Sequence, residues 1–203
     1  MPENAKVVVH EALGVASDLR RLVLECAAAD TAQPGQFLHI RVSDGLDPLL
    51  RRPLSIAEID PARRRLTVCY RVKGQGTQLL ARAAVGQSLD VLGPLGRGFQ
   101  LPQDGGLFLL AGGIGVFPLL ALADAARLRG IPTVLFWGGE DRAFLENAGW
   151  RDLQCASCQI YAATLDGSLG EAGLVTDLLV RQWSGRPEPW RQASIAACGP
   201  FGM

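Results

Sequence analysis

Residues 106–118 read GLFLLAGGIGVFP, and this stretch decides the fold of the second half of the chain. The continuous apolar run over 106–111 is typical of a strand buried on both faces, as in a parallel sheet. The glycines that follow allow a tight turn, and Pro118 suits the first turn of a helix, where its missing N–H costs nothing. A helix over 118–128 and a second apolar run over 133–137 complete the pattern, so the sequence predicts a βαβ unit and a parallel sheet.

The turn between this strand and this helix is a candidate nucleotide site. Its glycines allow the backbone to approach a diphosphate closely, at the N-terminus of the helix; they are Gly112, Gly113 and Gly115. The order Gly-Gly-x-Gly-x-x-Pro differs from the Rossmann Gly-x-Gly-x-x-Gly. After the second strand, Glu140 and Asp141 would repel a ribose 2′-phosphate and so favour NAD over NADP, although the cation Arg142 stands beside them.

The first half of the chain has a different pattern. Runs over 22–26, 37–42 and 65–72 alternate between apolar and more polar side chains, with turn residues between them. Short strands separated by frequent turns predict an antiparallel β-barrel. Residues 93–102 contain three glycines and two prolines, and are predicted to form a turn-rich hinge to the α/β half.

Two motifs in the first half suit a bound flavin dinucleotide. The first reads Arg-Pro-Leu-Ser over 52–55, where the arginine can pair with phosphate and the serine hydroxyl can reach a ring edge. The second runs from the strand over 65–72 through Gly76 and Thr77 into a helix predicted over 78–84, where backbone N–H groups suit a diphosphate. Each motif alone could be an exposed arginine or an ordinary turn. Their order, with about twenty residues between them, favours the flavin site.

Together these segments resemble the ferredoxin-reductase superfamily. The lead-in Asp-Pro-Leu-Leu-Arg over 47–51 is similar to one branch, the electron-transfer subunits of NAD-linked (type B) dihydroorotate dehydrogenases. The resemblance implies an FAD-binding β-barrel domain over 1–100 and an NAD-binding α/β domain over 101–203. It assigns FAD contacts to Arg52, Pro53, Leu54, Ser55, Cys69, Tyr70, Arg71, Gly76 and Thr77. It assigns NAD contacts to the three glycines of the turn and to Cys198, Gly199 and Pro200.

Cys198 illustrates how these assignments depend on context. By itself it would be read as a small buried hydrophobe, the usual fate of a free cysteine. It ends an apolar run over 193–197, and in the resembling family such a cysteine leaves room for the nicotinamide to approach the flavin.

The resemblance also implies an enzymatic role. Electrons from a partner, the FMN-containing dihydroorotate dehydrogenase catalytic subunit, would cross a [2Fe–2S] cluster, reach FAD on this chain and leave as hydride to NAD⁺, in pyrimidine biosynthesis. No side chain is required as an acid or base. Two alternatives stay open: the flavin subunit of an NAD(P)H-dependent ferredoxin reductase, hydrogenase or sulfite reductase complex, and a non-catalytic nucleotide-binding scaffold.

The cysteines do not provide the cluster site of the resembling family. Four clustered cysteines are needed, and the chain has five scattered ones: Cys26, Cys69, Cys155, Cys158 and Cys198. The C-x-x-C spacing of Cys155 and Cys158 has no second pair beside it, so we interpret it as a coincidence in a loop. We expect no metal site within residues 1–203, and we expect the native chain to continue beyond Met203 into a helix and the cluster loop.

Composition limits the other functions. The 203 residues include 20 basic and 20 acidic side chains, so no charge excess attracts the chain to nucleic acid or to a membrane surface. No signal segment and no apolar run of about 18 residues is present. An odd number of scattered cysteines is unlike a secreted disulfide framework, and we expect a cytoplasmic protein.

Overall fold

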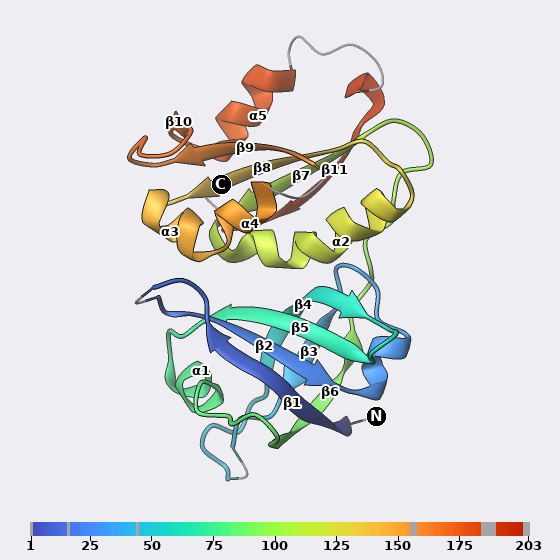
Figure 1. The fold of residues 1–203 in the computed structure, drawn as a ribbon, viewed down its shortest axis with the longest axis vertical. Helices are drawn as coiled ribbons and strands as arrows, with labels where there is room; N and C mark the ends of the chain where they lie inside the picture. Colours follow the sequence, from blue (N-terminus) through green and yellow to red (C-terminus); the bar gives the residue numbers. More distant parts are fainter. Residues whose placement is uncertain (1, 16, 44, 155–157, 184–189, 201–203) are drawn as a thin grey trace. The chain divides into compact units, whose positions relative to one another are not determined.

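In the computed structural model of this chain, the structure describes residues 2–15, 17–43, 45–154, 158–183 and 190–200. The chain divides into two compact units, Met1–Phe99 (unit 1) and Gln100–Met203 (unit 2), which are drawn in Figure 1. Cys155, one half of the C-x-x-C pair, lies outside the described residues. No helix among the described residues is long and apolar enough to cross a membrane.

Unit 1 is the predicted antiparallel β-barrel. Its strands are β1 (Pro2–Ala12), β2 (Leu19–Glu25), β3 (Phe37–Ile40), β4 (Arg52–Asp60), β5 (Arg65–Arg71) and β6 (Ser88–Leu95). They close in the order β1-β2-β5-β4-β3-β6, with every neighbouring pair antiparallel. Closure leaves no free sheet edge. A short 3₁₀ helix, η1 (Ala27–Asp30), and one α-helix, α1 (Gln75–Leu80), lie between strands.

The barrel is filled by alternate residues of its strands. On a strand, successive side chains point to opposite faces, so an alternating sequence gives one apolar face. The inward side chains form one buried cluster that includes Val7, Leu22, Leu24, Leu38, Ile40, Ile56, Leu66, Val68 and Val91. Leu80 of α1 joins the same cluster, so the helix is packed against the barrel core.

The helix and the hinge predicted in unit 1 have wrong boundaries. The helix predicted over 78–84 begins at Gln75 and ends at Leu80, because the hydroxyl of Thr77 accepts hydrogen bonds from the N–H groups of Lys73 and Gly74 and closes the first turn early. The hinge predicted over 93–102 begins too soon, since residues 93–95 belong to β6. Gly93 allows β6 to approach β3 closely where their pairing shifts register, because a Cβ there would lie 2.4 Å from a methyl group of Leu38.

Unit 2 is the predicted parallel α/β unit. Its strands are β7 (Leu107–Gly112), β8 (Thr133–Gly139), β9 (Gln159–Thr164), β10 (Glu171–Ala172) and β11 (Ser194–Cys198). Between them lie the α-helices α2 (Phe117–Leu128), α3 (Arg142–Asn147), α4 (Trp150–Gln154) and α5 (Val175–Trp183), and the 3₁₀ helices η2 (Gly113–Val116) and η3 (Trp190–Gln192). β7 is buried along its whole length, as the apolar run predicted.

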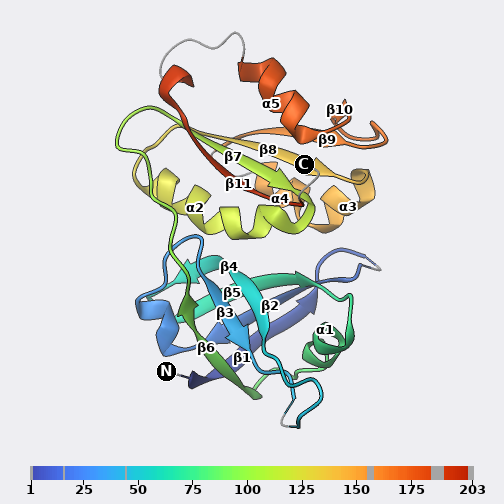
Figure 2. The same ribbon diagram turned by 180° about the vertical axis from the view of Figure 1, so that it is seen from behind.

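The sheet of unit 2 has a reversal of strand order beside β7. Its described strands lie in the order β10-β9-β8-β7-β11, and all pairs are parallel. The chain therefore moves outward from β7 through β8 and β9, and then returns to the other side of β7. Helix α5 covers one face and α2 the other (Figures 1 and 2). In open sheets of this kind, ligands bind outside the carboxyl ends of the strands at such a reversal.

Candidate nucleotide-binding sites

In unit 1 the two predicted flavin motifs meet at Arg52 and Gly76. Arg52 begins β4 and Gly76 lies in the first turn of α1. A Cβ added at Gly76 would lie 2.6 Å from Nε of Arg52 and 3.0 Å from its Cζ, so the guanidinium rests directly on the glycine. Nε of Arg52 is buried, and within the described residues it has no hydrogen-bond partner. A buried cationic N–H without a partner fits an anion that the protein itself does not supply.

Hydrogen bonds from Arg51 and Arg52 fix the loop that leads into β4. Nη2 of Arg52 donates to the carbonyl oxygen of Leu50 at 2.8 Å. Arg51, which the sequence analysis did not single out, donates to the carbonyl oxygen of Asp90 at 2.9 Å and to its carboxylate at 2.6 Å. These bonds attach the loop to β6. The loop therefore presents Arg52 from a fixed position.

Thr77 acts inside the turn rather than toward a ligand. Its hydroxyl accepts from the N–H groups of Lys73 and Gly74 at 3.0 and 3.1 Å, and donates to the carbonyl oxygen of Gly74 at 2.9 Å. The hydroxyl is fully used. A flavin contact at Thr77 would therefore run through its main chain.

The other predicted FAD residues divide between the two faces of the barrel wall. Ile56 of β4 pairs with Val68 of β5 and both side chains are in the core, so the flanking Ser55 and Cys69 point outward. By the same alternation Pro53 and Arg71 are on the outer side, whereas Leu54 and Tyr70 pack against the core. The structure thus does not bring all nine assigned side chains to one surface.

Tyr70 has a partner that the sequence analysis missed. Its hydroxyl lies 2.8 Å from Nε2 of His10, whose Nδ1 lies 2.8 Å from the carbonyl oxygen of Ala83. A carbonyl oxygen only accepts, so Nδ1 donates the hydrogen bond to Ala83. Burial raises the pKa of Tyr70, which keeps the hydroxyl protonated. This chain of bonds ties β1 and β5 to the segment after α1.

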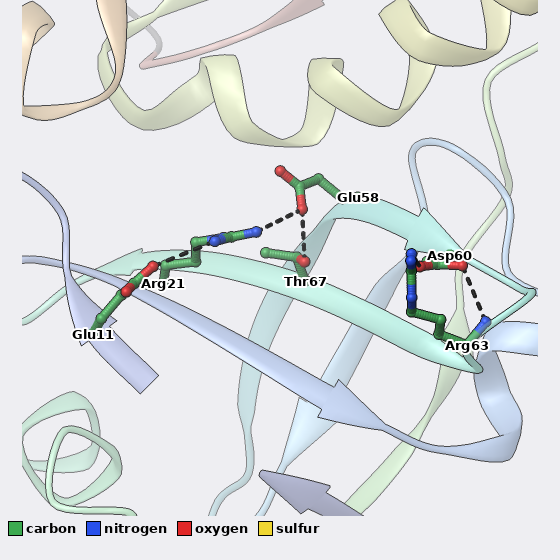
Figure 3. Close-up of polar contacts among 6 residues, drawn as sticks. All are labelled: Glu11, Arg21, Glu58, Asp60, Arg63 and Thr67. Carbon is green, nitrogen blue, oxygen red and sulfur yellow. Dashed lines mark hydrogen bonds and ion pairs between the residues drawn. The ribbon is translucent and has the colours of Figure 1, made fainter. Parts of the chain in front are cut away.

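The outer side of β2, β4 and β5 carries a polar cluster, drawn in Figure 3. Arg21 lies between two carboxylates, 3.3 Å from Glu11 and 3.2 Å from Glu58, and Thr67 donates to the Glu58 carboxylate at 2.8 Å. Cys69 is the cross-strand neighbour of Arg21. Burial, and then the negative charge of Glu58, raise the pKa of the Cys69 thiol from 9.0 to about 12. Cys69 is therefore an uncharged thiol at neutral pH.

We expect the Cys69 thiol to make the barrel less stable in alkaline solution. The native state holds this proton more tightly than the unfolded chain does, so the stabilisation is complete below pH 9.0 and is lost as the pH rises toward about 12. The free energy of unfolding, measured with urea at about pH 8 and about pH 10.5, should fall less between these pH values in Cys69→Ala than in the wild type. An identical loss in both proteins would contradict this.

In unit 2 the two predicted nucleotide motifs meet at Gly115. Ala111, which precedes the glycine turn, pairs with Cys198 at the end of β11. A Cβ added at Gly115 would lie 2.0 Å from the carbonyl oxygen of Cys198 and 3.0 Å from the N–H nitrogen of Gly199. Only glycine allows the turn to approach the Cys198–Gly199 peptide so closely.

This contact lies at the carboxyl ends of β7 and β11, where the strand order reverses. Gly113 has φ +57°, the left-handed region that favours glycine, and Gly112 is the buried last residue of β7. Gly199 and Pro200 follow β11 and are exposed. Burial raises the pKa of the Cys198 thiol, so it too is uncharged at neutral pH. The structure brings all the predicted NAD motifs to one edge of the sheet.

The neighbouring strand β8 also ends at this edge of the sheet, and the acidic pair Glu140 and Asp141 follows it directly. The carboxylate of Asp141 accepts from the N–H of Phe144 at 2.7 Å and so caps α3. The guanidinium of Arg142 donates twice to the carbonyl oxygen of Ser168, at 3.0 and 2.8 Å. Arg142 is thus attached to the loop after β9.

Comparison with known proteins identifies the family. The chain is 45% identical over 150 residues to the dihydroorotate dehydrogenase B (NAD(+)) electron transfer subunit of Geobacillus kaustophilus, a match to 72% of this chain and 57% of that protein. It is 42% identical over 208 residues to the subunit of the same name from Lysinibacillus sphaericus, covering 100% of this chain and 77% of the relative. The chain belongs to this family. No protein-family model matches it.

Membership of the electron-transfer-subunit family confirms the resemblance seen in the motifs. The fold agrees as well: a solved NADH-dependent reduced ferredoxin-NADP oxidoreductase superposes with a TM-score of 0.80 at 24% identity, over 99% of this chain and 69% of that one. At this identity the likeness extends to the fold alone. The chain spans 57% and 77% of the lengths of the two relatives.

Proposed function

We propose that this chain accepts electrons from an FMN-containing dihydroorotate dehydrogenase catalytic subunit and delivers them as hydride to NAD⁺, with FAD as its own cofactor, in pyrimidine biosynthesis. One observation carries the proposal. In each unit, two motifs far apart in the sequence meet at a glycine that has no room for a side chain, Gly76 in unit 1 and Gly115 in unit 2. A glycine at such a position allows another backbone segment, or the diphosphate of a ligand, to approach the main chain closely.

Unit 1 has the features that a flavin dinucleotide needs. Nε of Arg52, which has no hydrogen-bond partner among the described residues, can donate to a phosphate oxygen. The first N–H groups of α1 have no acceptor within the helix. Outward-pointing Ser55 and Cys69 offer a hydroxyl and a neutral thiol, which add no charge beside a flavin ring. A bound flavin supplies exchange of two electrons with a nicotinamide and of single electrons with a metal cluster.

Unit 2 has the features that NAD needs. The glycine turn and the Cys198–Gly199 peptide lie at the strand-order reversal, which is the usual ligand position in open α/β sheets. The acidic pair after β8 and the attachment of Arg142 to Ser168 support NAD rather than NADP. Because hydride moves directly between two cofactors, these residues bind and orient, and none needs to act as an acid or base.

The iron–sulfur step of the proposed route is not assigned to residues 1–203. A [2Fe–2S] cluster needs four well-placed cysteines, and the five cysteines of this sequence lack the required spacing. We therefore assign no cluster ligand to these residues.

The experiment is a spectroscopic assay of the purified chain without its partner. We expect a yellow protein whose flavin absorbance is bleached rapidly by NADH and more slowly by NADPH. Addition of the FMN-containing subunit to a full-length chain should then give NADH formation that depends on dihydroorotate. A colourless chain that takes up no added FAD would overturn the proposal in favour of a non-catalytic scaffold. Equal bleaching by the two nucleotides would remove the NAD preference.

A further inference from the structure

The glycine turn of unit 2 accepts a hydrogen bond from a buried tryptophan, Trp137, which no motif predicted. Trp137 lies near the carboxyl end of β8 and is 0% exposed. Its indole Nε1 donates to the carbonyl oxygen of Gly113 at 3.0 Å. A buried indole N–H that lost its acceptor would be costly. The side chain therefore both fills the core and fixes one specific carbonyl group.

The carbonyl oxygen that accepts this bond belongs to the Gly113–Ile114 peptide, at the start of the turn. Gly113 has φ +57° and begins η2, directly after the last residue of β7. In a trans peptide the carbonyl and the following N–H point in opposite directions. Because the Gly113 carbonyl is directed at Trp137 in the neighbouring strand, the N–H of Ile114 is directed away from that strand. Ile114 is 42% exposed, so the turn is open to solvent at this residue.

We propose that Trp137 is a positioning residue for nucleotide binding. Its indole N–H sets the orientation of the Gly113–Ile114 peptide, and thereby aims the N–H groups of the turn at the diphosphate of the dinucleotide. The inference rests on the proposed function, since it concerns how the same site binds NAD. It differs from a packing role, in which any large side chain at this position would serve.

Trp150 provides a matched control. It is also buried, it begins α4, and its ring lies 6.0 Å from that of Trp137 between centroids. No hydrogen bond from its indole to the turn is present among the described residues. Trp137→Phe and Trp150→Phe remove the same atoms from the same aromatic contact, but only the first removes the donor to Gly113.

The test is a titration of the FAD-loaded chain with NAD⁺ and a steady-state assay with NADH and an artificial acceptor. We expect Trp137→Phe to weaken NAD⁺ binding and raise KM for NADH by about tenfold, the effect of one lost buried hydrogen bond, with kcat and flavin content nearly unchanged. Trp150→Phe should leave both constants near their wild-type values. Equal effects of the two variants would overturn the inference and leave only packing.

A second variant covers the case in which Trp137→Phe does not fold. Gly113→Ala strains the same peptide through its φ while leaving the indole intact, and its Cβ would meet no atom closer than Phe144, at 4.0 Å. A folded Gly113→Ala with unchanged affinity for NAD⁺ would also overturn the inference. If the wild-type chain binds no NAD⁺ at all, the proposed function itself fails, which is a distinguishable result.

Discussion

Gly115→Ala should abolish reduction of the flavin by NADH while the protein remains yellow. The added Cβ would lie 2.0 Å from the carbonyl oxygen of Cys198 and 2.5 Å from its carbonyl carbon. Both are main-chain atoms at the end of β11, so no side-chain rotation relieves the clash, and either the turn or the end of the strand must move. Overpacking of this kind costs about 1–3 kcal/mol. Because the displaced atoms belong to the proposed nucleotide site, we expect at least a 100-fold loss, roughly 3 kcal/mol of binding.

The measurement is stopped-flow reduction of the flavin by NADH, with flavin content and thermal unfolding recorded for each variant. Gly130→Ala is the control, because Gly130 lies in the turn after α2 and a Cβ there meets nothing within 4 Å, although its φ is +68°. It should lose some stability and keep its reduction rate. A Gly115→Ala protein that is reduced at the wild-type rate would place the nicotinamide site elsewhere.

The features of unit 2 that follow from local sequence were predictable. The apolar run over 106–111 is buried throughout and forms β7 from Leu107 onward, and the helix predicted over 118–128 differs from α2 by one residue. The reason why Gly115 must be glycine was not predictable, because the obstructing atoms belong to Cys198, more than eighty residues later in the chain. Trp137 was likewise missed, although a tryptophan inside a buried strand signals that its N–H needs an acceptor.

In unit 1 the strand alternation could have refined the predicted site. Cys69, Tyr70 and Arg71 are consecutive residues of one strand, so their side chains cannot all face one ligand. The structure has Tyr70 in the core and its neighbours outside. The early start of α1 depends on a three-way hydrogen-bond arrangement of Thr77, which propensity does not reveal. The contact of Arg52 with Gly76 required the closed barrel.

Arg52→Ala should produce a chain that loses most of its flavin. Nε of Arg52 is buried without a partner in the described part of unit 1, and the guanidinium rests on Gly76 at the start of α1. Removal of a charge-assisted, bidentate contact to phosphate costs about 1.5–3 kcal/mol, so the dissociation constant for FAD should rise by about 10- to 150-fold. Titration of the apoprotein with FAD, followed by flavin fluorescence, measures this constant.

Two further variants test whether the loss of FAD affinity comes from the position of the Arg52 guanidinium: Gly76→Ala, which displaces it, and Arg63→Ala, which is the control for charge. A Cβ at Gly76 would lie 2.6 Å from Nε and 2.9 Å from Cδ of Arg52, so it displaces the guanidinium without removing it, and we expect a smaller but clear loss of FAD affinity. Arg63 pairs with Asp60 at 2.9 Å in the turn between β4 and β5 (Figure 3) and should bind FAD like the wild type when replaced by alanine. Since both arginine variants remove one positive charge from the same unit, a general charge effect would lower the affinity in both. A loss of FAD affinity confined to Arg52→Ala and Gly76→Ala would instead locate the phosphate contact where Arg52 rests on Gly76. Equal FAD affinity in the wild type and Arg52→Ala would exclude this contact.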